Sequence, residues 1–159
     1  KDPITFINCI KKLVQTEMEV QAGMVGDGEL LDECLVEIQK LELENNITLY
    51  GFQPNPYKYM ADSKILLMPS KSEGFPLVPM ESMSLGVPVV CTGVGGLKDF
   101  VIDGENGFIC KDIETMENAL KLLLTDKSLW RQMSDKAIMT AKEQNDMEMY
   151  IKKIKHLYE

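Results

Sequence analysis

The decisive stretch of the sequence reads Ser72-Glu73-Gly74-Phe75-Pro76-Leu77-Val78-Pro79-Met80-Glu81, and Leu85-Gly86-Val87-Pro88-Val89-Val90 follows it. Glu73 and Glu81 are carboxylates on either side of a glycine-proline turn, and an apolar strand comes just after them. Pro76 suits the first position of a helix, because its φ is fixed there and its missing N–H costs nothing. The pattern predicts a loop at Glu73 where a strand ends, then a helix that carries Glu81 near its start.

The start of that helix is a candidate anion site. Its first backbone N–H groups have no partner within the helix, so they are free to bind a phosphate. Glu73 before them and Glu81 behind them would accept hydrogen bonds from hydroxyls on either side of that phosphate. The stretch therefore predicts a phosphorylated, polyhydroxylated ligand, and a nucleotide-sugar fits this description.

The composition indicates one ordinary globular domain over residues 1–159. The chain is 45% apolar and 26% charged, which is usual for such a domain. Its net charge of −8 argues against nucleic acid, since a phosphate backbone requires a basic face. No apolar run approaches the ~20 residues of a membrane span, and no signal peptide opens the sequence.

The cysteines and the single histidine indicate neither a disulfide framework nor a metal site. Cys9, Cys34, Cys91 and Cys110 are far apart, lie among apolar neighbours and form no C-x-x-C pair. They are expected to be reduced thiols in the core of a cytoplasmic protein. His156 lies among lysines and is expected at the surface, so no metal ligands cluster in the sequence.

Hydrophobic periodicity predicts alternating strands and helices. Short apolar runs predict strands at 19–25, 47–50, 64–68, 88–91 and 107–110, and helical spacing predicts helices at 3–16, 31–41, 57–61 (a short one at most), 76–85, 97–102 and from 113 to the end. This alternation predicts an α/β fold: a doubly wound, Rossmann-like parallel sheet covered on both faces, with C-terminal helices over 126–159.

Glycine turns follow the ends of several predicted strands, at residues 26–28, 51, 74 and 93–96. In a doubly wound sheet the ligand binds outside the carboxyl ends of the strands. The turns are therefore expected to line one rim of the sheet, which places the ligand there.

Four ordered motifs resemble those of retaining GT-B glycosyltransferases of family 4 (glycosyl transferases group 1). Glu73 and Glu81, set in Pro69-Ser70-Lys71-Ser72-Glu73-Gly74-Phe75-Pro76, resemble the E-x7-E signature of that family. Gly93-Val94-Gly95-Gly96 and Asp103-Gly104-Glu105-Asn106-Gly107-Phe108 resemble its downstream glycine motifs, and Gly26-Asp27-Gly28 resembles an upstream turn. The resemblance covers residues 1–125 and implies the C-terminal, donor-binding half of a GT-B fold.

In that family the domain begins with a strand that ends in a glycine-arginine pair, and a lysine precedes the first helix. Lys1 matches the lysine, whereas the strand and the N-terminal acceptor domain have no counterpart here. We therefore expect a fragment of a two-domain enzyme whose first strand is missing. A naturally short protein is the alternative.

The resemblance implies a role for each matching residue. Glu81 would bind the ribose hydroxyls, Glu73 would contact the donor sugar as the catalytic residue, and Lys1 would neutralise the diphosphate without a metal. The backbone N–H groups of Gly74, Phe75, Leu77 and Val78, around Pro76, would hold the sugar and the diphosphate; Gly51 and Phe52 would lie near the base. The nucleotide-sugar is a substrate, and no cofactor is expected.

The whole enzyme is then expected to transfer a hexose, with retention, to a glycan or lipid-linked acceptor in surface-polysaccharide or glycoconjugate assembly. The domain alone would be inactive. The expected location is the cytoplasm, with peripheral contact at the inner membrane face where the missing domain meets an acceptor lipid.

Other interpretations of these residues stay open. A nucleotide-sugar epimerase of the same fold and a non-catalytic binding module are alternatives; a glycoside hydrolase pair is less favoured, because its chemistry lacks the phosphate-type turn. Glu73 as a helix cap, Glu81 on a solvated helix face and Gly26-Asp27-Gly28 as a plain turn are further readings. Lys71 receives no role.

Overall fold

The computed structural model describes residues 1–74 and 77–144. Helices and strands alternate along most of this part of the chain. The helices are α1 Pro3–Gln15, α2 Leu31–Lys40, α3 Tyr57–Ala61, α4 Leu77–Ser84, α5 Leu97–Phe100, α6 Ile113–Thr125 and α7 Lys127–Gln144; the strands are β1 Ala22–Val25, β2 Ile47–Gly51, β3 Leu66–Met68, β4 Val89–Thr92 and β5 Gly107–Cys110.

Every strand pairing is parallel, so the predicted α/β class with parallel pairing is confirmed. The strands form two sheets rather than the single sheet that the sequence predicts. One sheet pairs β1 with β2, and the other has the order β3-β4-β5. The expectation of one continuous sheet is corrected, because no hydrogen-bonded ladder joins β1 to β3 in the described part of the chain.

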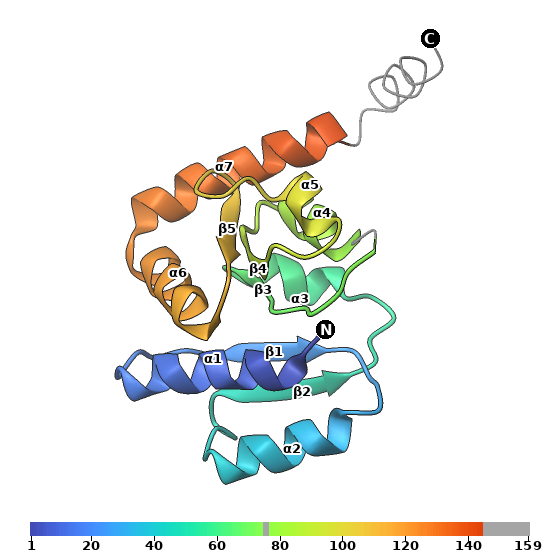
Figure 1. Cartoon of the computed structure of the whole chain (residues 1–159), viewed down its shortest axis with the longest axis vertical. Coiled ribbons are helices and arrows are strands. Elements are labelled where there is room, and N and C mark those ends of the chain that lie inside the picture. Colours follow the sequence, from blue (N-terminus) through green and yellow to red (C-terminus); the bar gives the residue numbers. More distant parts are fainter. Residues whose placement is uncertain (75–76, 145–159) are drawn as a thin grey trace.

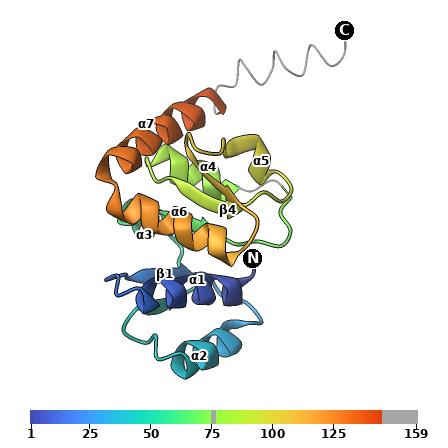
Figure 2. The same cartoon turned by 60° about the vertical axis from the view of Figure 1, so that its left-hand side comes forward.

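The two sheets lie in two stacked halves of the molecule. Figure 1 shows β1 and β2 with α1 and α2 in one half, and the second sheet with α3 to α7 in the other. Helices α1 and α6 face each other between the halves, which the turned view also shows (Figure 2). Ile7 and Leu13 of α1 belong to the same buried core as Met116 and Leu123 of α6, so this helix pair joins the halves.

Local capping explains where the helices begin. Asp2 caps α1 by accepting a hydrogen bond from the Thr5 N–H, and Pro3 opens the first turn. Asp126 has an extended backbone, and its carboxylate accepts hydrogen bonds from the N–H groups of Ser128 and Leu129. The helical pattern predicted from residue 113 onward therefore forms two helices in the described part of the chain, since Asp126 ends α6 and caps α7.

The C-terminal helix α7 is tied to the second sheet by buried polar contacts. Ser134 Oγ donates to the Gly86 carbonyl oxygen at 2.6 Å, and Asn106 Nδ2 donates to Thr140 Oγ1 at 3.1 Å. The predictions for residues 145–159, including the surface position of His156, lie outside the described residues. The described part of α7 thus belongs to the domain.

The four cysteines are unpaired and buried, which confirms their predicted place in the core. Burial raises the pKa of both Cys9 and Cys91 to about 12. A thiol with so high a pKa is protonated at neutral pH and is a poor nucleophile. These cysteines therefore pack as small apolar side chains.

Candidate functional site at the carboxyl ends of the strands

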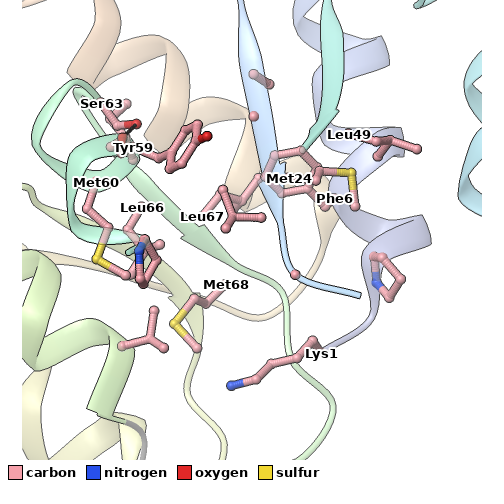
Figure 3. Close-up of a pocket in the computed structure, with 18 of the residues that line it drawn as sticks. Lys1, Phe6, Met24, Leu49, Tyr59, Met60, Ser63, Leu66, Leu67 and Met68 are labelled. Atoms are coloured by element: carbon pink, nitrogen blue, oxygen red, sulfur yellow. Dashed lines mark hydrogen bonds between the residues drawn. The ribbon is translucent and has the colours of Figure 1, made fainter. Parts of the chain in front are cut away.

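The carboxyl ends of the strands open onto a cavity of about 1010 Å³. The loops after β1 and β3, the residue after β2 and the side of α4 all contribute to its wall. Figure 3 shows Lys1 at one end of this cavity, near Met68 at the end of β3. The lining residues that the sequence singles out are Lys1, Gly26, Asp27, Gly28, Phe52, Ser70, Val78 and Glu81. Of the glycine turns predicted at the carboxyl rim of the strands, residues 26–28 line this cavity, whereas Gly51, Gly74 and residues 93–96 are not among its lining residues.

Glu73 lies at the centre of a polar cluster on this rim. Its Oε1 accepts hydrogen bonds from Lys1 Nζ at 2.7 Å and from Ser70 Oγ at 2.6 Å. The Glu73 side chain is 8% exposed, whereas that of Lys1 is 62% exposed. A lysine ammonium has three donors, so Lys1 can hold Glu73 and still bind a ligand. Two residues with separately predicted roles are thus in direct contact.

A second ion pair holds the same loop. Lys71 Nζ lies 3.0 Å from Asp2 Oδ2, so the loop after β3 is joined to the start of α1 by two ion pairs. Lys71 had no predicted role, and nothing in its sequence spacing pointed to Asp2. Ser70, which is fully buried, lay within the quoted motif but was not assigned to the site.

The Glu73 carboxylate is held in its ionised form. Burial raises its pKa, but the hydrogen bonds from Lys1 and Ser70 and the positive charge of Lys1 outweigh that effect, and the net pKa is lowered. The cluster therefore keeps Glu73 a hydrogen-bond acceptor at neutral pH.

We expect Glu73 to make stability depend on pH in acid. A carboxylate with a lowered pKa stabilises the folded state above its ordinary pKa of 4.5, and this stability is lost as the pH falls through the lower folded pKa. Urea denaturation at pH values from about 6 to about 3 measures the free energy of unfolding, which should fall less steeply with decreasing pH for Glu73→Gln than for the parent chain. The same dependence on pH in the two chains would contradict a lowered pKa for Glu73.

Glu81 lies within α4, and its partner comes from α3. Tyr57 Oη donates to Glu81 Oε1 at 2.9 Å, across 24 positions of sequence. The hydrogen bond to Glu81 and the negative charge of that carboxylate raise the pKa of Tyr57. Sequence reasoning did not find Tyr57, because no periodicity relates a residue at the start of a short helix to one in the next helix.

Glu81→Gln is expected to lower the pKa of Tyr57 toward its ordinary value of 10, because the substitution removes the negative charge beside the phenol. Titration of selectively labelled tyrosine by NMR measures this pKa. Glu105→Gln, which changes an exposed glutamate in the loop before β5, is the matched control and should leave it unchanged. An unchanged Tyr57 titration in Glu81→Gln would show that the hydrogen bond does not form in solution.

The remaining predicted residues are spread along the rim. Phe52 is 70% exposed and lines the main cavity, whereas Gly51 lies in a neighbouring hollow of about 390 Å³. Val78 lines the main cavity, but Leu77 is 58% exposed and is not part of its wall. Phe75 and Pro76 lie outside the described residues, so a helix start at Pro76 stays a prediction.

The glycine turn after β4 packs directly on the Glu73 loop. Gly96 N donates to the Gly74 carbonyl oxygen at 3.2 Å. A Cβ atom built on Gly95 would lie 1.8 Å from the Glu73 carbonyl oxygen, and Gly95 has a φ of +52°. Only glycine allows these two loops to approach so closely. The glycine turn at residues 93–96 therefore packs against the backbone of the loop that carries Glu73.

The described residues contain no group of three or more His, Cys, Asp or Glu residues arranged to hold a metal ion. None of their helices is long and apolar enough to cross a membrane.

Comparison with characterised proteins gives relatives over most of the chain. N-acetyl-alpha-D-glucosaminyl L-malate synthase of Bacillus anthracis is 30% identical over 154 residues, which are 96% of this chain and 40% of that protein. A 4-alpha-N-acetylgalactosaminyltransferase of Campylobacter jejuni, whose full name includes a diphospho-undecaprenol compound, is 34% identical over 136 residues, which are 84% of this chain and 37% of that protein. The chain thus spans less than half the length of these relatives.

Solved structures show the same fold. TarM matches with a TM-score of 0.89 and 27% identity over 99% of this chain and 32% of that one. A mutant of TarM from S. aureus, solved with Fondaparinux, alpha-GlcNAc-glycerol and UDP, has a TM-score of 0.88 and 26% identity over 99% of this chain and 33% of that one. The family profile of glycosyl transferases group 1 matches residues 1–156. The chain therefore belongs to the glycosyl transferases group 1 family.

Proposed function

We propose that this chain is the donor-binding domain of a retaining GT-B glycosyltransferase that transfers a hexose from a nucleotide-sugar. The observation that carries the proposal is the cluster of Lys1, Ser70 and Glu73 at the carboxyl rim of the strands. It places a cation and an ionised acceptor together near a cavity whose wall also carries Glu81. This combination suits a ligand with both phosphate and hydroxyl groups.

In the proposed complex each group binds one part of the donor. Glu81 accepts hydrogen bonds from the ribose hydroxyls, and Glu73 accepts them from the donor sugar. Lys1 and the first N–H groups of α4 hold the diphosphate, and their positive charge stabilises the nucleoside diphosphate as it leaves. The base lies near Gly51 and Phe52, where an exposed aromatic ring offers a face for stacking.

The relatives support the donor and the class of acceptor. The TarM mutant was solved with UDP, and an Anabaena HepE structure with UDP and glucose matches at 25% identity and a TM-score of 0.84. The Campylobacter relative is named for a lipid-linked diphosphate, and a Bacillus subtilis relative is a poly(glycerol-phosphate) alpha-glucosyltransferase. We infer a glycan or lipid-linked acceptor in surface-polysaccharide or glycoconjugate assembly.

The acceptor is bound, in this proposal, by an N-terminal domain of a longer protein. The chain covers 40% of the Bacillus anthracis relative and 37% of the Campylobacter relative, which leaves length for such a domain in both. The longer protein would act at the cytoplasmic face of the inner membrane when its acceptor is a lipid, and transfer would need no metal. The domain alone would be inactive.

Calorimetric titration of the full-length protein with UDP, GDP, ADP and their sugars tests the proposal. We expect one nucleoside diphosphate to bind, with 1:1 stoichiometry, and its affinity to fall in Glu81→Ala. Glu105→Ala is the control for a lost surface carboxylate. Binding of none of these ligands by a well-folded protein would refute the donor-binding role.

A further inference from the structure

The two carboxylates of the candidate site have different surroundings. Glu73 is paired with Lys1, whereas Glu81 forms no ion pair with any residue that the structure describes. The side-chain contact of the Glu81 carboxylate is the hydrogen bond that Tyr57 Oη donates to Oε1 at 2.9 Å. A neutral phenol therefore holds Glu81, and within the described part of the chain no cation competes with a ligand for its oxygens.

The hydrogen bond from Tyr57 leaves most of the Glu81 carboxylate free. A carboxylate accepts about four hydrogen bonds, and the phenol occupies one of these positions on Oε1. Glu81 lines the main cavity, whereas Tyr57 is not among the lining residues. Tyr57 thus holds the carboxylate from outside the cavity and takes no space from a ligand.

This contact restricts a side chain that would otherwise move. Glu81 is only half-buried on α4, and a glutamate has several rotatable side-chain bonds. Ordering such a side chain when a ligand binds costs free energy, and the cost is smaller where the side chain is already held in place. The hydrogen bond from Tyr57 therefore preorganises Glu81 before the ligand arrives.

Tyr57 also joins Glu81 to the segment that follows β2. Tyr57 is the first residue of α3, and its backbone N–H donates to Asn55 Oδ1 at 3.2 Å. The same segment begins with Phe52, which lines the main cavity and is the proposed contact of the base. One hydrogen bond thus links the segment beside the proposed base to the carboxylate beside the proposed ribose.

A carboxylate held in place distinguishes ligands by their hydroxyl groups. A ribose presents neighbouring hydroxyls that can donate to it, and a 2′,3′-dideoxyribose presents none. A site built to bind a hydroxyl binds the analogue without it more weakly, because the polar group of the site loses water and gains no partner. The penalty is largest when the carboxylate cannot turn away into solvent, and the hydrogen bond from Tyr57 opposes that turn.

We propose that Tyr57 is a positioning residue that holds Glu81 so that the donor site selects nucleotides with ribose hydroxyls over nucleotides that lack them. Tyr57 acts through Glu81 and does not itself contact the donor. The inference rests on the proposed donor-binding function, since that function assigns the ribose to Glu81. It adds the residue that makes this contact selective.

Calorimetric titration of the full-length protein with UDP and 2′,3′-dideoxy-UDP, or with the matching pair for whichever base binds, tests the inference. The parent protein should bind UDP about tenfold or more tightly than the dideoxy form. Tyr57→Phe removes the donor hydroxyl and should lower this ratio about threefold to tenfold, mainly by weakening UDP. Tyr57 is 49% exposed, so loss of its hydroxyl leaves the core intact.

Tyr50→Phe is the matched control. Tyr50 lies in β2 and is 40% exposed, and the substitution removes a hydroxyl that does not contact Glu81. This variant should keep the ratio of the parent protein. A merely structural role of Tyr57 would weaken both ligands equally and would leave the ratio unchanged in Tyr57→Phe.

The possible failures are distinguishable. A ratio in Tyr57→Phe within about twofold of the parent ratio, with UDP still bound, would overturn the inference and leave the donor-binding role intact. Binding of neither member of any pair by the folded parent protein would refute the donor-binding role and the inference with it.

A double-mutant cycle gives a second test. Glu81→Ala should bind UDP and its dideoxy form about equally, and adding Tyr57→Phe should change the affinity for UDP by no more than about twofold, because Tyr57 acts through Glu81. A larger loss in the double variant would show that Tyr57 contacts the donor directly, and it would overturn the positioning role.

Discussion

Glu73→Gln in the full-length protein is expected to lower the rate of sugar transfer about 100-fold or more, the usual effect of removing one pre-placed electrostatic group. Glutamine keeps the shape of the side chain and can still accept from Ser70 Oγ, which donates to Glu73 at 2.6 Å. It removes the negative charge that pairs with Lys1 at 2.7 Å. Lys1 would then lose its fixed position at the proposed diphosphate site, and the sugar would lose a charged acceptor.

Initial rates with a radiolabelled donor sugar measure this effect. The matched control is again Glu105→Gln, an identical change of an exposed glutamate in the loop before β5, away from the carboxyl rim. The control should transfer at the parent rate. If Glu73→Gln kept more than about a third of the parent rate while folding normally, Glu73 would have no catalytic role.

Gly95→Ala is expected to destabilise the domain by about 2 to 5 kcal/mol. One part of this free energy is the cost of placing an alanine in the left-handed backbone region, and the other is the cost of inserting a Cβ atom into a closely packed contact. The new Cβ atom would meet the Glu73 carbonyl oxygen at 1.8 Å, a backbone atom that cannot turn away. The two loops would have to separate, and Glu73 would move from Lys1 and Ser70. A loss of nucleotide affinity should therefore accompany the loss of stability.

Urea denaturation gives the change in the free energy of unfolding, and Gly104→Ala separates its two causes. Gly104 has a φ of +77°, but a Cβ atom there would meet nothing within 4 Å. That variant should lose only the backbone part, about 1 to 2 kcal/mol, and should keep its nucleotide affinity. Equal losses in the two variants would show that the contact between Gly95 and Glu73 is relaxed in solution.

Much of the fold follows from local pattern. The apolar run at residues 88–91 and the Asp112 capping box with Thr115 are short-range features, and β4 and α6 form there as expected. Asp126 shows the limit of that reasoning. Helical spacing continues through it, yet its carboxylate binds the next backbone N–H groups and starts a new helix. Periodicity does not register such competition between a side chain and the helix backbone.

The features of the candidate site also fall into two groups, those that the sequence predicts and those that only the fold creates. The sequence by itself determined the parallel α/β class, the family motifs and the choice of Glu73 and Glu81, because strand ends, glycine turns and carboxylate spacing are local properties of the chain. Only the tertiary structure decided that Lys1 and Ser70 bind Glu73, that Tyr57 binds Glu81 and that Gly95 lies against the Glu73 backbone. The contacts of Lys1, Tyr57 and Gly95 join residues 72, 24 and 22 positions apart, and they depend on how the crossovers bring strand ends together. For the same reason the division of the described strands into two sheets is visible only in the folded molecule, since pairing is a relation between strands and not a property of either one.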